Sequence, residues 1–186
     1  MDDQKIIDLY FDRNEQAITE TDVKYGKLCH SIAYNILSNR EDTEECVNDT
    51  WLRAWNAMPP TRPNVLKLFF AKIIRNISFD RYKRANAQKR GGGEIDLALS
   101  ELEECIAAQS DVEDEVEARE LENSINRFLA TLSETERNIF LRRYFYVEKV
   151  SSIAQRYSMR DSNVFVILSR TRSKLKKHLI DEGYFI

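Results

Sequence analysis

The sequence predicts an all-α protein in which two small helical domains are joined by a flexible acidic linker. In both halves of the chain, apolar residues recur at the three- and four-residue spacing of amphipathic helices. The 186 residues include only 5 glycines and 3 prolines, which is too little turn chemistry for a fold of many strands. Gly91, Gly92 and Gly93 follow one another, and three glycines in a row carry a high ordering cost. They predict a flexible junction between the domains.

The N-terminal half contains three expected helices. The first ends near Ser38, and the second begins near Glu41 with acidic residues in its positively polarised first turn. The proline-rich stretch 59–63 ends the second helix, because proline cannot continue the backbone hydrogen-bond ladder. The third helix is expected over residues 65–89. The expected inward-facing residues are Tyr25, Leu28, Cys29, Ile32, Ala33, Ile36 and Leu37, then Val47, Trp51, Leu52, Ala54, Trp55 and Met58, then Leu66, Phe69, Phe70, Ile73, Ile74, Ile77 and Phe79.

The C-terminal half adds two local signals to the helical pattern. Residues 133–136 (Ser-Glu-Thr-Glu) fit a capping box, which predicts that a helix begins there. A short helix at 151–157, a tight turn and a long helix from Asp161, capped by Asp161 or Ser162, follow in the order of a helix-turn-helix. Two contacts are expected inside it, since Ile153 and Ala154 would pack against the long helix. Their partners are Val164 and Leu168.

Charge is distributed unevenly, although the net charge is only −3. Residues 72–90 carry seven basic groups and one acid, and residues 142–178 carry ten basic groups and two acids. Residues 94–122 between them carry twelve acids and one arginine. Charges are screened beyond about 10 Å, so local fields decide docking. Two basic stretches that flank an acidic connector favour a nucleic-acid partner.

Several function classes are disfavoured by the sequence. No stretch of about 18 apolar residues predicts a membrane span, and the start lacks the apolar segment of a signal peptide, so we expect a cytoplasmic protein. Cys29, Cys46 and Cys105 form no CxxC pair and read as reduced thiols. The only histidines, His30 and His178, lie far apart, and no phosphate-binding or nucleophile motif occurs. We therefore expect no metal, no cofactor and no enzymatic activity.

Two constellations point to DNA. In the helix-turn-helix, the long basic helix would enter the major groove, although a three-helix bundle with a solvated basic face fits the same pattern. In residues 69–84, aromatic and basic side chains alternate on one helix. Stacking on aromatics combined with cations along the backbone is how single-stranded DNA is bound. The alternative is that Phe69, Phe70 and Phe79 are core residues.

Three blocks in order carry a family resemblance. Residues 34–55 look like regions 2.1–2.2, residues 73–81 look like regions 2.3–2.4, and residues 132–175 look like region 4 of sigma factors. The chain resembles the extracytoplasmic-function group of the sigma-70 family of RNA polymerase sigma factors. The resemblance implies a sigma region 2 domain over 1–90, an acidic linker over 91–120 and a sigma region 4 domain over 121–186. The helix-turn-helix would then lie at about 149–168.

The resemblance also implies partners and site residues. An alternative sigma factor binds core RNA polymerase through the β′ clamp helices and the β flap, and it binds promoter DNA in duplex and single-stranded form. An anti-sigma factor is a further partner that the resemblance allows. The residues implied for polymerase binding are Asp42, Glu45, Asn48, Asp49 and Arg53. Those implied for the minus-ten element are Phe69, Phe70, Arg75, Asn76, Asp80, Arg81, Lys83 and Arg84, and those for the minus-thirty-five element are Arg160, Ser162, Asn163, Phe165, Val166, Arg170, Arg172 and Lys174.

The chain departs from the family at two places. Residues 165–167 (Phe-Val-Ile) stand on the recognition helix where the family usually has polar or basic residues. Either Arg160, Ser162, Asn163 and DNA shape carry the reading, or an apolar residue contacts thymine methyl groups, or this face meets a protein. Ala71 replaces the family's usual aromatic residue, so a base pocket would depend on Phe69 or Phe70.

Two other functions remain open at this point. A two-domain helix-turn-helix regulator would bind duplex DNA without core polymerase, with 121–186 as the DNA-binding part and 1–90 as a sensor. A regulator that occupies the polymerase without reading a promoter would bind core and show no promoter preference.

Overall fold

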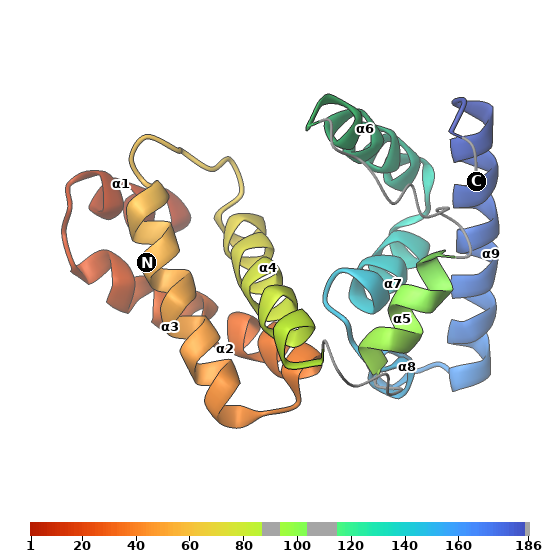
Figure 1. Ribbon diagram of the computed structural model, residues 1–186, viewed down its shortest axis with the longest axis horizontal. Coiled ribbons are helices and arrows are strands. Elements are labelled where there is room, and N and C mark those ends of the chain that lie inside the picture. The colour runs from red at the N-terminus through yellow and green to blue at the C-terminus, as the bar shows by residue number, and fades with distance from the viewer. Residues whose placement is uncertain (87–93, 104–114, 185–186) are drawn as a thin grey trace. The chain divides into compact units, whose positions relative to one another are not determined.

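The computed structural model describes residues 1–86, 94–103 and 115–184. All regular secondary structure in these ranges is helical, which confirms the all-α prediction (Figure 1). The chain divides into two compact units, Met1–Gly91 and Gly92–Ile186. The glycine run and Cys105 lie outside the described residues. None of the described helices is both long and apolar enough to cross a lipid bilayer.

The N-terminal unit is built around α2, which packs against its three other helices. Asn39 caps α3, because its Oδ1 accepts the backbone N–H of Asp42 at 3.1 Å. Sequence analysis missed α1, whose Ile6, Ile7 and Tyr10 are buried. These three apolar residues form too short a pattern to stand out from the sequence alone. The four helices are α1 (Asp3–Phe11), α2 (Gln16–Leu37), α3 (Arg40–Ala57) and α4 (Leu66–Asn86).

The C-terminal unit packs α6, α7 and α8 against the long helix α9. The predicted contacts of the helix-turn-helix are present, because Ile153, Ala154, Val164 and Leu168 belong to one buried cluster. Ser158 in the turn has φ 52°, the left-handed conformation for which glycine is usual. The five helices are α5 (Glu94–Glu103), α6 (Glu115–Thr131), α7 (Glu134–Tyr144), α8 (Val150–Arg156) and α9 (Asp161–Asp181).

The two predicted helix caps of this unit have different outcomes. The capping box at α7 is confirmed, since Ser133 Oγ accepts the N–H of Glu136 and the Glu136 carboxylate accepts the N–H of Ser133, both at 3.3 Å. The Lys174 ammonium also donates a hydrogen bond to Glu136 Oε1 at 2.7 Å. This bond is the main cause of the lowered pKa of Glu136, and the hydrogen bond from Ser133 is the second. The cap predicted for α9 is wrong. Arg160, not Asp161 or Ser162, stands at the N-cap, with no side-chain cap bond.

Helix α5 comes from the acidic segment and packs on α7. Its Glu101 binds Arg143 at 3.1 Å and Arg172 at 3.4 Å, and accepts a hydrogen bond from the Tyr144 hydroxyl at 2.8 Å. The Arg143 side chain is 0% exposed. A buried cation is tolerated only when it is paired and hydrogen-bonded, so Glu101 is required by the interior of this unit. Burial raises the pKa of Tyr144, which keeps its hydroxyl protonated as a donor.

We expect Glu101→Ala to lower the free energy of unfolding of the C-terminal unit by about 3 kcal/mol, the cost of breaking a buried ion pair. Both tryptophans, Trp51 and Trp55, belong to the N-terminal unit. Urea unfolding followed by tryptophan fluorescence should therefore stay unchanged, while far-ultraviolet circular dichroism shows an earlier transition. Ser100→Ala, an exposed position on the same helix, is the matched control. A Glu101→Ala variant as stable as this control would contradict the assignment.

Candidate nucleic-acid interface

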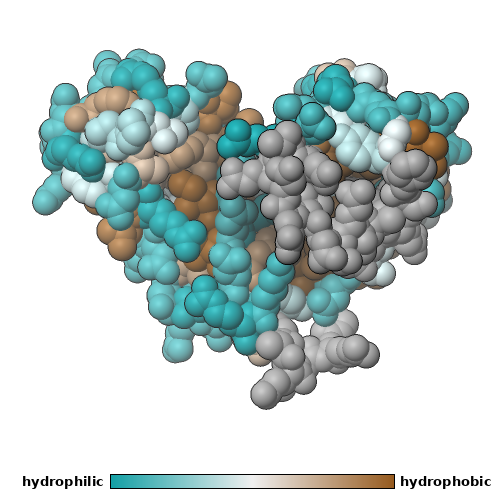
Figure 2. Space-filling view, turned by 45° about the horizontal axis from the view of Figure 1, so that its top comes forward, coloured by the Kyte–Doolittle hydropathy of each residue, from teal (hydrophilic) through white to brown (hydrophobic). Residues whose placement is uncertain are grey.

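Helix α4 separates an apolar face from a polar one. Its buried residues recur at helical spacing, so the opposite side of the helix is turned to solvent. Figure 2 shows hydrophobic patches between hydrophilic side chains on the visible face of the N-terminal unit. Four residues predicted to contact DNA are exposed: Asn76, Asp80, Lys83 and Arg84. The buried residues are Leu66, Phe70, Ala71, Ile74, Ile77 and Ser78.

Half-buried aromatic rings flank this polar face. Phe69 is partly exposed and meets the buried Phe70 edge-on, with ring centroids 5.6 Å apart. Arg75 places its guanidinium 4.5 Å from the centroid of the Phe79 ring, a cation–π arrangement. Burial lowers the pKa of Arg75. The helix thus presents rings and cations together, the combination that binds single-stranded nucleic acid.

Phe70 belongs to the core, which corrects its predicted role in DNA binding. Its side chain is 0% exposed. The centroid of its ring lies 5.5 Å from the ring centroids of Tyr25 and Trp51 and 6.5 Å from that of Tyr10. A DNA strand cannot reach a fully enclosed ring. Of the two adjacent phenylalanines, Phe69 alone is accessible from solvent. The core interpretation of these aromatics therefore holds for Phe70 and only in part for Phe69 and Phe79.

Arg81 connects the two sets of residues that the sequence assigned to different partners. Its guanidinium lies 3.1 Å from Asp42 Oδ1 and also pairs with Glu45, both on α3. The pKa of Arg81 is raised mainly by its hydrogen bond to Glu45 and next by its contact with Cys46 Sγ. In this arrangement the two carboxylates neutralise Arg81. C-terminal to Arg81, the exposed cations of α4 are Lys83 and Arg84.

The outer side of α3 is polar except for one leucine. Asn48, Asp49 and Arg53 are exposed as predicted for a polymerase-binding face. Leu52 was expected in the core, and this is wrong, because its side chain is 59% exposed. Leu52 is thus an apolar side chain among the exposed polar residues of this face. Trp55 is half-buried, with the Arg13 guanidinium 5.3 Å from its ring centroid.

In the C-terminal unit, the residues predicted for duplex DNA lie mostly on the exposed side of α9. Arg172 is the exception, since it is largely buried and pairs with Glu101, which corrects its predicted role as a DNA contact. Lys174 is half-exposed and already bound to Glu136. The exposed members of the set are Arg160, Ser162, Asn163, Phe165, Val166 and Arg170.

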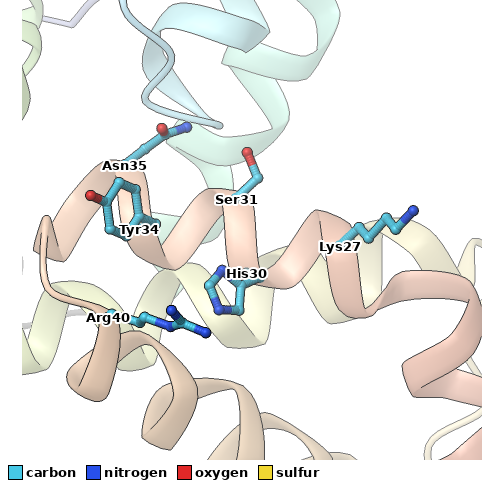
Figure 3. Close-up of a pocket in the computed structure, with 6 residues that line it drawn as sticks. All are labelled: Lys27, His30, Ser31, Tyr34, Asn35 and Arg40. Atoms are coloured by element: carbon cyan, nitrogen blue, oxygen red, sulfur yellow. The ribbon is translucent and has the colours of Figure 1, made fainter.

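A pocket of about 440 Å³ lies between α2 and the start of α3. In Figure 3 the Arg40 side chain extends toward the His30 ring. Arg40 also binds Glu44 of its own helix at 3.1 Å, which reduces the local positive charge. Sequence reasoning expected His30 at a helix surface and attached no chemistry to it, and five of the six lining residues do belong to α2, with Arg40 added by α3. The pocket is lined by Lys27, His30, Ser31, Tyr34, Asn35 and Arg40.

Metal-binding geometry is not found among the residues that the structure describes, where no three His, Cys, Asp or Glu side chains gather. Cys29 and Cys46 are buried free thiols, and burial raises the pKa of Cys29 to about 12. Neither thiol is therefore a ready nucleophile or ligand.

Part of the N-terminal unit matches a known protein family. The family described as Sigma-70 region 2 matches residues 23–88, which include α3, α4 and most of α2. No curated protein matches the chain. Among solved structures, one described as CnrH in complex with the cytosolic domain of CnrY aligns over 97% of this chain and 98% of its own. The identity in that alignment is 17% and the TM-score is 0.45.

We expect the double variant Lys83→Ala, Arg84→Ala to bind a mixed-sequence single-stranded oligonucleotide more weakly than the unaltered chain. Loss of two phosphate contacts should reduce the slope of log affinity against log salt by about 1.4. Fluorescence anisotropy at several salt concentrations measures this slope. Arg81→Ala should change it less, because Arg81 is already neutralised.

Two other exposed cations provide the matched control for lost charge. Lys27→Ala combined with Arg53→Ala removes two positive charges from α2 and α3. An equal loss of slope in this control would show that overall charge, and not the surface of α4, binds the strand.

Proposed function

We propose, from the match of residues 23–88 to sigma-70 region 2, that the chain is an alternative sigma factor of the extracytoplasmic-function type. It binds core RNA polymerase in the cytoplasm and directs initiation at specific promoters, and it performs no catalysis itself. The domains would be region 2 over 1–90 and region 4 over 121–186, with α5 of the intervening segment packed onto the second unit. The family match to residues 23–88 carries the proposal.

The surface of α4 supports a role in capturing the unpaired minus-ten strand. Accessible rings at Phe69 and Phe79 offer stacking platforms, and Asn76 and Asp80 offer polar groups for a base edge. Lys83 and Arg84 continue the helix with charge for the phosphates. Strand separation needs a site that holds the flipped base more favourably than the duplex does, and this combination supplies both the base contacts and the backbone contacts.

The outer side of α3 supports binding to the polymerase β′ clamp helices. Leu52 would be the apolar anchor, with Asn48, Asp49 and Arg53 around it. Arg81 holds Asp42 and Glu45 to α4 by ion pairs. The polymerase-binding side and the strand-binding side thus belong to two helices that are directly tied together. The C-terminal unit would bind the β flap and place α9 in the minus-thirty-five major groove.

We expect Leu52→Glu to weaken binding to core polymerase by about tenfold or more, as the loss of an interface anchor does. The fold should be retained, because the side chain is exposed. Surface plasmon resonance with immobilised core enzyme measures the affinity. Val23→Glu, at an apolar residue of α2 that is 78% exposed, is the matched control. Equal affinities of the two variants would exclude Leu52 as the anchor.

The function itself is tested by mixing the full chain with core RNA polymerase and genomic fragments and mapping the transcript starts. We expect starts that share two spaced sequence elements and that are absent with core enzyme alone. Recovery of the β and β′ subunits in a pull-down is the companion measurement. Tight duplex binding by the free chain, with no selective transcript, would instead favour the two-domain regulator that acts without polymerase.

A further inference from the structure

The first turns of α9 expose two large apolar side chains. Val164 and Leu168 are fully buried against α8, and this register turns Phe165 and Val166 outward, while Ile167 packs in part against the same cluster. Phe165 is 50% exposed and Val166 is 46% exposed. About half of each side chain is therefore available for contact with a partner. The nature of that partner follows from what surrounds them.

The surroundings of this apolar pair favour a polyanion. In residues 160–177, Asp161 is the single acid among six basic residues. Two of the six, Arg172 and Lys174, are committed to Glu101 and Glu136 within the unit. Arg160 and Arg170 are exposed on either side of the apolar pair. The helix therefore combines an apolar centre with cationic ends, which suits a groove with phosphate walls and an apolar feature on its floor.

The spacing of the exposed residues fits the floor of a major groove. Asn163, Val166 and Arg170 follow one another at three and four residues, so they form one line along the helix, and Phe165 lies about 100° to one side of Val166. Asparagine can bind the N6 and N7 edge of adenine with two hydrogen bonds. The apolar group that the major groove presents is the 5-methyl of thymine. Adenine and thymine are thus the bases that Asn163 and Val166 of this line match.

We propose that Phe165 and Val166 read thymine methyl groups and that Asn163 reads an adenine edge, so that the duplex element chosen by this unit is rich in A·T pairs. This inference rests on the proposed function, in which α9 enters the minus-thirty-five groove. It assigns to the apolar residues the contact that arginine makes with guanine in other recognition helices. Specificity then comes from methyl burial and not from a guanidinium fork.

Replacement of thymine by deoxyuridine tests the proposal, because it removes the methyl group and leaves base pairing intact. Duplexes are first selected from a random library by the full chain bound to core polymerase. Each thymine of the selected upstream element is then replaced singly. We expect one or two positions at which affinity falls about fourfold, the factor for one methylene-sized group left in water. Thymines outside the element should have no effect.

Variants of the helix link the effect to its residues. With Phe165→Ala or Val166→Ala, the thymine and deoxyuridine duplexes should bind equally at the matching position, since the methyl has lost its partner. Ile180→Ala, at a residue 52% exposed on the same helix, should keep the preference. This comparison isolates the pairwise contact from a general loss of affinity.

Each outcome supports or overturns a stated claim. Selected duplexes that show no deoxyuridine effect would overturn the methyl contact and leave the sigma assignment standing. Loss of polymerase binding by the Phe165 and Val166 variants, with the thymine preference retained, would show that this face binds a protein. Failure to select any duplex would overturn the proposed function together with the inference.

Discussion

The aromatic cluster centred on Phe70 determines which side of α4 faces solvent. Rings from α1, α2 and α3 enclose this side chain, and a helix has only one way to place it there. Once Phe70 points inward, the 3.6-residue period turns Asn76 and Lys83 outward. The same rule applies to α9, where Val164 and Leu168 fix the exposure of Phe165 and Val166. In both units, the core residues decide the chemistry of the surface.

Periodicity made the helices and most of the core predictable from the sequence. The apolar stripes, the capping box at Ser133 and the helix-turn-helix contacts all follow from spacing, which a single sequence contains. The N-cap of α9 differed from the prediction, because the backbone enters the helix at Arg160 without a side-chain cap. Helix α1 is too short for its pattern to separate from chance. Spacing also left Phe69 and Phe70 indistinguishable, since neighbouring positions differ by only about 100° around the helix.

The candidate site was less predictable, because several of its residues are defined by contacts between distant segments. The local sequence predicts that Arg81 is a strand-binding cation, but the fold pairs it with Asp42 and Glu45, which are more than thirty residues away in the chain. The local sequence likewise predicts that Arg172 contacts phosphate, but the fold pairs it with Glu101. Leu52 sits one position after Trp51 on a helix, so composition favoured burial, while the packing of α3 leaves it outside. Long-range ion pairs leave no mark in local sequence patterns.

The triad of Glu101, Arg143 and Arg172 also limits which substitutions homologues of this chain can accept. A mutation that removes the acid takes the shared ion-pair partner from two guanidinium groups at once, whereas a mutation of either arginine still leaves one ion pair. The three positions are far apart in the sequence, and loss of the acid is the change that calls for compensation at the other two. Homologues that lack the glutamate should therefore carry neutral residues at the two arginine positions, a covariation that spans three helices.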